Sequence, residues 1–227
     1  MRQAPNFIRK IEQRDRLYPA RLNDLYDPPP CLYICGNSRI LKMPMVAIVG
    51  ARNASSEGLK NAGFFAQSLA RAGCIIVSGL AKGIDGAAHR ATLGLGANHG
   101  TVAVCGTGLN IAYPQEHCGL MQAISRQGLL ISELSPEIGP KAFHFPRRNR
   151  IIAALCLGVI VIEAAERSGS LITARLASEL GREVFALPGP INDPLYAGCH
   201  QLIQQGAKLA RGPKDVLEDL IFPKNPI

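Results

Sequence analysis

The sequence lacks any long apolar run. Its first 22 residues have no apolar signal core, and no stretch reaches the length of a membrane span. Zinc-site spacing is missing too, because the closest pair of the seven cysteines, Cys31 and Cys35, has no second pair near it. These absences predict a soluble, cytoplasmic protein whose cysteines are buried free thiols in a reducing compartment.

Common nucleotide-binding and catalytic signatures are also absent. There is no G-x-x-x-x-G-K-[ST], which excludes a P-loop NTPase, and no G-x-G-x-x-G after the first predicted strand. The fragment GTG at 106–108 leads into LNIAYP and not into a helix, so ordinary NAD binding is disfavoured. No paired carboxylates, metal-ligand cluster or nucleophile–base spacing stands out. We therefore predict no catalytic residue, no metal and no cofactor.

What the sequence does contain, from residue 45 onward, is a regular alternation of short apolar runs and helical patterns. The runs are β-branched and nearly uncharged, as expected for strands covered on both faces. The predicted strands are 45–50, 74–79, 101–106, 129–133, 157–164 and 182–189, and the predicted helices are 55–72, 83–95, 115–127, 147–156 and 169–181. This order predicts an α/β fold with a doubly wound, mostly parallel sheet of the Rossmann type.

The ends of the chain differ from this pattern. Residues 1–40 are rich in turn formers and include three consecutive prolines, so we expect an extension packed on the sheet edge with a short strand at 31–35. Residues 41–222 form the expected Rossmann-type domain, with a closing helix at 213–220 that begins at Pro213. Residues 223–227 are interpreted as a tail.

Positive charge gathers in one stretch. The formal net charge is +8 and the pI is near 9.3, which suits a polyanionic partner. No acidic residue lies between Lys141 and Arg150, and the basic residues there are Lys141, His144, Arg147, Arg148 and Arg150. They follow the fourth predicted strand, at the edge where parallel sheets bind ligands. The stretch favours a groove that neutralises phosphates, in which Phe143, His144 and Phe145 could stack bases. The alternative is pairing with Glu133, Glu137 or Glu163.

Two other loops at this edge are candidates for binding an anion. Ser168, Gly169 and Ser170 begin a predicted helix, where free N–H groups and the helix dipole favour a phosphate, although a plain serine N-cap is equally common. The second loop presents Ser78, Gly79 and Lys82, and a helix begins at Gly83. Asp85 and His89 are four residues apart on that helix and can hydrogen-bond, either as an acid–base pair or as a contact that fixes the loop.

The same segments resemble the DNA-processing family known as DprA or Smf. The matching motifs occur in family order and include VAIVGARNASSEG, VSGLAKGIDGAAH, FPRRNRIIAAL and VIVIEAAERSGSLITA. The resemblance runs from about Tyr18 to Leu220 and implies a homodimer that binds and protects single-stranded DNA without sequence preference. It also implies loading of the RecA recombinase onto that DNA during natural transformation. Many members add a small N-terminal helical domain and a C-terminal winged-helix-like domain, of which neither is visible here.

The resemblance also implies the DNA-contacting positions. They are Gly50, Arg52, Ser78, Gly79, Lys82, Lys141, Phe145, Arg148, Arg150, Ser168, Gly169 and Ser170. Three features depart from the family pattern: Ala51 replaces a hydroxyl residue, His200 stands in an asparagine position, and the segment 94–100 is longer.

Two other functions stay open. One is a nucleotide-hydrolysing enzyme of a related Rossmann-type fold, which would use the serine loop, Asp85, His89, Glu133 and Glu163. The other is an interaction scaffold without a ligand.

Overall fold

The centre of the fold is a strand that is covered on both faces. In the computed structural model, which describes residues 7–220, all five residues of β3 (Met45–Val49) are buried. β3 pairs in parallel with β4 (Ile75–Ser78) on one side and with β7 (Gly158–Val161) on the other. A strand buried on both faces cannot alternate polar and apolar residues, which accounts for the continuous apolar runs in the sequence.

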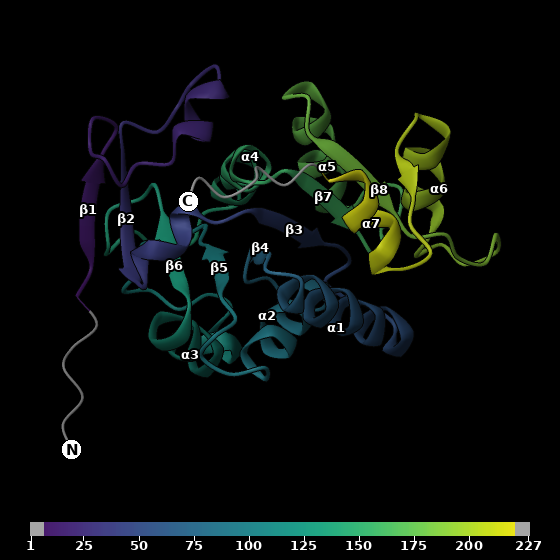
Figure 1. Cartoon of the computed structure of the whole chain (residues 1–227), viewed down its shortest axis with the longest axis horizontal. Helices are drawn as coiled ribbons and strands as arrows, with labels where there is room; N and C mark the ends of the chain where they lie inside the picture. The colour runs from purple at the N-terminus through teal and green to yellow at the C-terminus, as the bar shows by residue number, and fades with distance from the viewer. Residues whose placement is uncertain (1–6, 221–227) are drawn as a thin grey trace.

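Nine strands form one sheet in the order β1-β2-β6-β5-β4-β3-β7-β8-β9 (Figure 1). β1 and β2 are antiparallel to their neighbours, and all other pairs are parallel. The remaining strands are β1 (Arg9–Glu12), β2 (Cys31–Gly36), β5 (Thr101–Val104), β6 (Leu129–Ser132), β8 (Glu183–Ala186) and β9 (Lys208–Leu209). The doubly wound sheet and its six predicted parallel strands are confirmed. β1 and β9 were not predicted, because four and two residues are too few to show a period.

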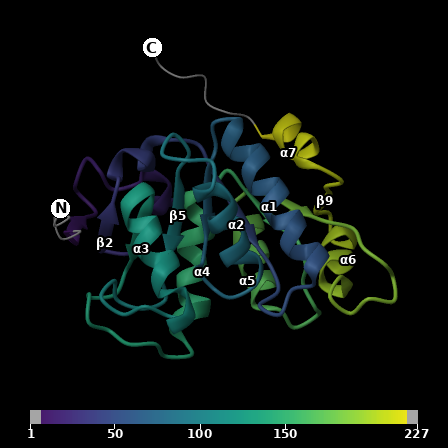
Figure 2. The same cartoon turned by 90° about the horizontal axis from the view of Figure 1, so that it is seen from below.

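Helices cover both faces of the sheet (Figure 2). One face carries α1 (Ser56–Arg71), α2 (Ile84–Leu93), α3 (Cys118–Gln127) and α7 (Pro213–Asp219), and the other carries α4 (His144–Leu155), α5 (Gly169–Glu179) and α6 (Ala197–Gln204). Short 3-10 helices form at Ala20–Asp24, Ser38–Lys42 and Gln115–His117. The five helices predicted between strands and the closing helix all form, whereas α6 was not predicted.

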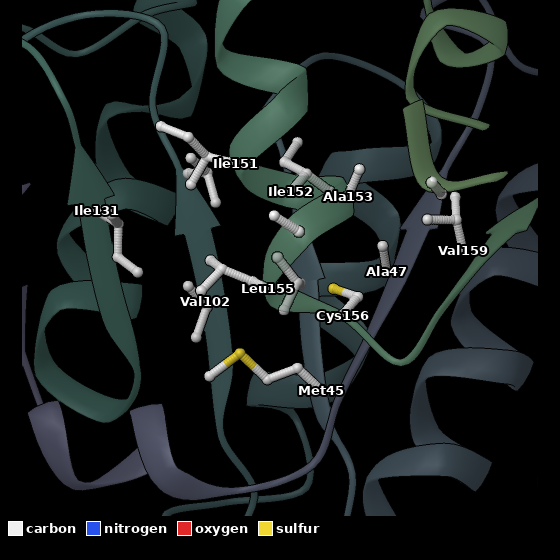
Figure 3. Packing of buried hydrophobic residues seen from close by; sticks show 14 of the residues in the cluster. Met45, Ala47, Val102, Ile131, Ile151, Ile152, Ala153, Leu155, Cys156 and Val159 are labelled. Atoms are coloured by element: carbon white, nitrogen blue, oxygen red, sulfur yellow. The ribbon is translucent and has the colours of Figure 1, made fainter. Parts of the chain in front are cut away.

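α4 begins at His144, three residues before the predicted start. The prediction placed the start after Pro146, but proline is tolerated in a first helical turn because the N–H groups there have no partner within the helix. The last two turns of α4 pack on the sheet, where Ile151 and Leu155 belong to the same buried cluster as the strand residues Val102 and Val159 (Figure 3). Each such buried side chain contributes about 1.5–3 kcal/mol, and together they fix the rotation of α4 about its axis.

The N-terminal segment joins the same sheet, since β2 pairs with β6 and β1 with β2. The hydroxyl of Tyr18 donates to the carbonyl of Pro29 at 2.7 Å and closes the loop between them. The division into an extension and a domain at residue 40 stays a prediction, and the expected tail at 223–227 lies outside the described residues. Between residues 7 and 220, no helix is both long and apolar enough to cross a bilayer.

None of the seven cysteines, all of which lie within residues 7–220, forms a disulfide, and five of them are buried as expected. Burial raises the pKa of Cys74 to about 11 and that of Cys105 to about 12, so both thiols are protonated at neutral pH. Cys118 is exposed and Cys31 is half-buried, so the prediction of buried thiols was wrong for these two positions.

Candidate functional site

A pocket opens where the chain reverses its direction of winding across the sheet. From β3 the chain winds outward through β4, and later returns to the other side of β3 as β7. The loops that leave β3 and β7 therefore diverge, and a crevice remains between them at the carboxyl ends of the strands. The pocket there has a volume of about 600 Å³. It is lined by the loop after β3, the loop after β7 and the start of α4.

The pocket brings together seven of the twelve predicted contact residues. They are Gly50, Arg52, Phe145, Arg148, Ser168, Gly169 and Ser170. The other five, which are Ser78, Gly79, Lys82, Lys141 and Arg150, lie outside its lining.

Arg148 lines the pocket but is buried, with only 5% of its surface exposed. Its Nη1 donates to the carbonyl of Gly79 at 2.6 Å and also to the carbonyl of Val104. Its Nε donates to Asn149 at 3.2 Å. The guanidinium is thus bonded to the ends of β4 and β5, and it joins α4 to these strands. The sequence suggested a phosphate ligand, whereas the structure uses this charge to hold the pocket wall.

Gly79 is fixed from both sides by buried charges. Its N–H donates to Asp85 Oδ2 at 3.1 Å, and its carbonyl accepts from Arg148. A Cβ at this position would lie 2.5 Å from Arg148 Nη2 and 2.8 Å from Asp85 Oδ2, which is closer than van der Waals contact allows. Burial raises the pKa of Asp85, and the charge of Arg148 opposes that rise. Burial also lowers the pKa of Arg148, which Asp85 opposes in turn.

The expected contact between Asp85 and His89 is not formed, so this prediction was wrong. His89 Nδ1 lies 2.7 Å from Thr101 Oγ1, and the imidazole is fully buried. Burial lowers its pKa to about 3, with nearby positive charges adding to the effect, so the ring is neutral at neutral pH. Asp85 instead accepts from the N–H groups of Gly79 and Ala81. Asp85 holds the loop after β4 in place, and His89 joins α2 to β5.

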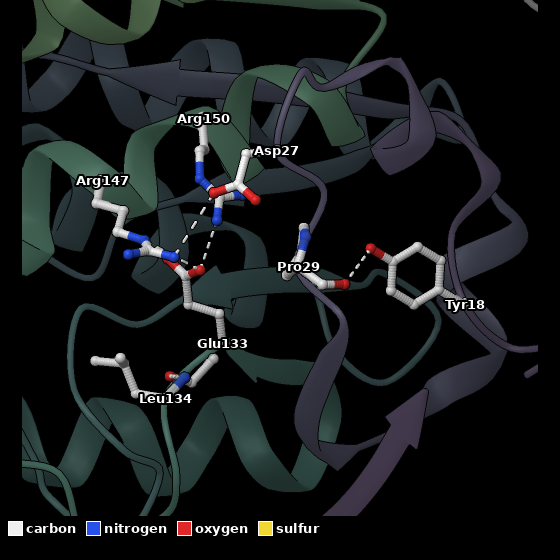
Figure 4. A network of polar contacts seen from close by, with 8 residues as sticks. Tyr18, Asp27, Pro29, Glu133, Leu134, Arg147 and Arg150 are labelled. Carbon is white, nitrogen blue, oxygen red and sulfur yellow. Dashed lines mark hydrogen bonds and ion pairs between the residues drawn. The ribbon is translucent and has the colours of Figure 1, made fainter. Parts of the chain in front are cut away.

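Two other arginines of α4 turn away from the pocket and contact one glutamate (Figure 4). Arg150 Nη2 lies 2.6 Å from Glu133 Oε2, and both side chains are nearly buried, with 13% and 9% exposed. Arg147 lies 3.5 Å from the same carboxylate and 3.8 Å from Asp27, and it is exposed. The alternative that these arginines pair with Glu133 is therefore confirmed. Glu137 accepts from Asn110 and Glu163 from Ser55, so neither takes part.

Arg52 and Arg167 are the exposed cations of the pocket. Neither forms an ion pair with any residue between 7 and 220. The Arg52 guanidinium lies over the Phe145 ring, 5.9 Å from its centroid. Phe145 in turn packs on Gly106, where a Cβ would lie 2.7 Å from the ring. The sequence analysis missed Arg167, although its place directly before Ser168 and the predicted helix was the available signal.

The N-termini of α1 and α5, which both lie at the pocket, differ in the groups that accept hydrogen bonds there. At α1, the Glu163 carboxylate accepts from the N–H of Ser55 at 2.9 Å and from its hydroxyl at 2.5 Å, while the Ser55 hydroxyl accepts from Gly58 at 2.9 Å. At α5, the Ser168 hydroxyl, 3.4 Å from the N–H of Ser170, is the only side-chain cap that residues 7–220 provide. Gly169 is exposed there, and a Cβ on it would meet no atom within 4 Å. The α5 terminus is therefore open to an anion, and the α1 terminus is filled by a carboxylate.

The predicted residues outside the pocket have varied environments. Ser78 is fully buried, and its hydroxyl donates to the carbonyl of Ile48 at 2.6 Å, so it is a structural contact. Lys82 is exposed and pairs with the exposed Glu116 at 2.5 Å. Lys141 is exposed near the start of α4. Both lysines lie at the same edge of the sheet as the pocket, since they follow β4 and β6.

The positions that depart from the family pattern are accommodated within the fold. The N–H of Ala51 donates to the Glu163 carbonyl at 2.7 Å, a contact that needs no side-chain hydroxyl. His200 Nε2 lies 3.1 Å from the carbonyl of Gly189 and so bridges α6 to the loop after β8. Within residues 7–220, no group of three or more His, Cys, Asp or Glu side chains is arranged to hold a metal ion.

Comparison with known proteins gives a consistent family. The family model of DNA recombination-mediator protein A matches residues 9–221. The DNA processing protein DprA of Streptococcus pneumoniae is 51% identical over 208 residues, which are 92% of this chain and 73% of that protein. Protein Smf of Escherichia coli is 48% identical over 213 residues, which are 93% of this chain and 56% of that protein.

Solved structures agree with these matches. DprA of S. pneumoniae has a TM-score of 0.90 at 49% identity and covers 95% of this chain and 75% of its own. DprA of Helicobacter pylori, described for its single-stranded DNA binding mode, has a TM-score of 0.85 at 30% identity, over 94% of this chain and 97% of its own. A molybdenum cofactor binding protein of Rippkaea orientalis, with a TM-score of 0.56 at 16% identity over 78% of this chain and 94% of its own, shares the fold alone. The resemblance found in the motifs is confirmed, and the chain belongs to the DNA recombination-mediator protein A family, that of the DprA and Smf proteins.

Proposed function

We propose that this protein binds single-stranded DNA without sequence preference, in the pocket between the loops that follow β3 and β7. The observation that carries the proposal is the pair of exposed arginines at that pocket, Arg52 and Arg167, which have no carboxylate partner among the described residues. Unpaired cations beside an aromatic ring suit a strand whose phosphates and bases are both accessible. The single-stranded DNA binding reported for the H. pylori relative supports the same conclusion.

Each part of the pocket has a distinct role in this proposal. Arg52 and Arg167 neutralise phosphates, and the open N-terminus of α5 at Ser168 and Gly169 donates backbone N–H groups to an adjacent phosphate. The predicted contacts Gly50 and Ser170 line the pocket beside them, and Phe145 forms its aromatic wall. Lys82 and Lys141 extend the positive edge beyond the pocket. We assign Ser78, Gly79, Arg148 and Arg150 to the support of the wall and not to direct phosphate contact, because each is hydrogen-bonded within the protein through at least one polar group.

Charge removal at the pocket tests the proposal. We expect the double variant Arg52→Ala, Arg167→Ala to bind an oligothymidine at least about tenfold more weakly at low salt. Loss of two phosphate contacts should make the slope of log K against log salt shallower by about 1.4. The matched control is Arg71→Ala, Arg126→Ala, which removes the same charge from exposed positions on α1 and α3. Equal affinity of the two double variants would place the DNA elsewhere.

Homodimer formation and loading of RecA onto the bound strand complete the proposal, and they rest on family resemblance. Mass measurement in solution with and without DNA tests the first. RecA filament formation on DNA already covered by a single-stranded DNA-binding protein tests the second, and a rate unchanged by this protein would exclude loading. A cytoplasmic location stays a prediction.

The absence of enzyme activity also stays a prediction. No observation favours nucleotide hydrolysis, since the side chains considered for it have structural partners: Asp85 holds a loop, His89 is buried on Thr101, and Glu163 caps α1. Incubation with nucleoside monophosphates is expected to release no free base, and a robust turnover would overturn this view.

A further inference from the structure

An aromatic residue next to the pocket has no evident structural use for its exposed ring. Tyr113 lies in the loop after β5 and is 44% exposed. Its ring centroid is 5.1 Å from that of Phe145, with the two planes inclined by 39°. Tyr113, Phe145 and Arg52 therefore form a continuous row that leads out of the pocket.

The hydroxyl groups distinguish Tyr113 from most of the other tyrosines. Tyr18 donates to Pro29, Tyr33 lies 3.4 Å from Ser135 Oγ, and Tyr196 is hydrogen-bonded to Glu163. Within residues 7–220 the Tyr113 hydroxyl has no hydrogen-bond partner, so its ring is held by contact with Phe145. Phe145 is itself fixed against Gly106.

Sheet order places Tyr113 at a useful distance from the phosphate-binding arginines. β5, β4, β3 and β7 are consecutive in the sheet, and Tyr113, Lys82, Arg52 and Arg167 follow them in that order. Neighbouring strands are about 4.8 Å apart, so the ends of β5 and β7, from which the loops to Tyr113 and Arg167 start, are about 14 Å apart. A mononucleotide in the pocket is too short to cover that distance, whereas an oligonucleotide reaches both ends.

We propose that Tyr113 is a base-stacking platform, on which a nucleotide next to the one in the pocket lays its base. This inference rests on the proposed function, because the strand must first bind at Arg52 and Arg167. It adds a specificity: the platform selects polynucleotides over single nucleotides, and strands with bases over bare sugar–phosphate chains. A base has a π-face whatever its identity, so the contact does not depend on sequence.

Fluorescence provides a direct test because the chain contains no tryptophan. Tyr113→Trp introduces a single indole, and stacking of a base on it quenches its emission. We expect oligothymidine to quench the indole and thymidine monophosphate to leave it unchanged. The control is Phe64→Trp, whose position on α1 is 56% exposed, lies more than two helical turns from the pocket, and should show no quenching with either ligand.

Affinity measurements separate stacking from a structural role. We expect Tyr113→Ala to weaken oligothymidine binding by about 5- to 150-fold, while Tyr113→Phe keeps wild-type affinity. Binding of an abasic strand of equal length should be the same for Tyr113→Ala and wild type, because no base is present to stack. Equal weakening for both strands would mean that Tyr113 only shapes the pocket.

The possible failures are distinguishable. If oligothymidine binds wild type in an Arg52- and Arg167-dependent manner but leaves the indole at position 113 unquenched, the stacking platform is refuted and the proposed function stands. If oligothymidine does not bind at all, both are refuted.

Discussion

Replacing Arg148 by methionine tests whether this arginine belongs to the scaffold or to the ligand site. The variant keeps most of the side-chain volume and removes the guanidinium that joins α4 to the carbonyls of Gly79 and Val104. It also leaves Asp85, which is only 6% exposed, without its compensating charge. Arg148 and Asp85 form no ion pair within 4 Å, but both are buried and each opposes the pKa shift of the other. Removing one partner of a buried ion pair costs about 3–5 kcal/mol because the remaining charge stays desolvated, and the loss of the two carbonyl contacts adds to the cost here. We expect Arg148→Met to lower the free energy of unfolding by about that amount.

The loss of stability in Arg148→Met should depend on pH, and the direction of this dependence follows from the pKa of Asp85. Burial raises the pKa of this carboxyl above its unfolded value, so the native state holds a proton that the unfolded state has already lost. Stability therefore falls as the pH rises between the unfolded and the native pKa. Without the charge of Arg148, the pKa of Asp85 in the native state rises further. The pH interval over which stability is lost therefore extends to higher pH. The penalty of Arg148→Met should thus be smaller near pH 5 than near pH 8.

Urea unfolding at the two pH values measures this effect. Arg147→Met is the matched control, because its exposed side chain should contribute no more than about 1 kcal/mol. Adding Asp85→Asn to Arg148→Met should recover part of the loss and remove most of its pH dependence. If Arg148→Met unfolds like wild type but binds oligothymidine much more weakly, the guanidinium is a DNA ligand and the reasoning fails.

Three other outcomes follow from the same structure. Gly79→Ala should lower the free energy of unfolding by about 1–3 kcal/mol in thermal or urea unfolding, because the added methyl group meets two buried charged groups. Arg150→Ala should cost about 1.5–3 kcal/mol by the same measurement, since it removes a charged hydrogen bond to the nearly buried Glu133, and full stability would contradict the pairing. Burial raises the pKa of both Tyr18 and Tyr196 to about 12, so stability should be lost as the pH rises from about 10 towards 12. Phenolate absorbance followed with circular dichroism checks this, and ionisation of all tyrosines near pH 10 with the fold intact would refute it.

Six strands and the doubly wound class of the sheet were predictable, because a buried parallel strand must be apolar throughout and must be followed by a crossover. The order of the strands in the sheet was not predicted. The burial of Arg148 was not predicted, although part of the signal was present. Arg148 is three, four and seven residues before Ile151, Ile152 and Leu155, so on a continuous helix it shares their buried face. The predicted helix 147–156 already contained Arg148, so this spacing was available, but the stretch was interpreted from its charge as a phosphate-binding loop.

Other contacts of the site could not be predicted from local pattern. Glu133 was one of three carboxylates suggested for the arginines, but the choice of Glu133, which directly follows β6, depends on where α4 lies. His89 reaches Thr101 because α2 packs over β5. Such pairs depend on how elements from distant parts of the chain are placed, and periodicity carries no information about that. Spacing along the helix instead suggested a contact between Asp85 and His89, which the packing replaced with stronger tertiary partners.

The N-termini of α1 and α5 differ in whether a protein carboxylate already occupies them. This difference explains how a Rossmann-type sheet can suit a polynucleotide instead of a dinucleotide. In the dinucleotide-binding form of this fold, the pyrophosphate sits on the N-terminus of the first helix after the first parallel strand. Here the Glu163 carboxylate already accepts hydrogen bonds at that terminus, and a second anion would be repelled. The free donors and cations lie instead at α5 and on the loop residues Arg52 and Arg167, spread along the sheet edge. An extended chain of phosphates matches such a distribution, whereas a compact pyrophosphate matches a single helix end.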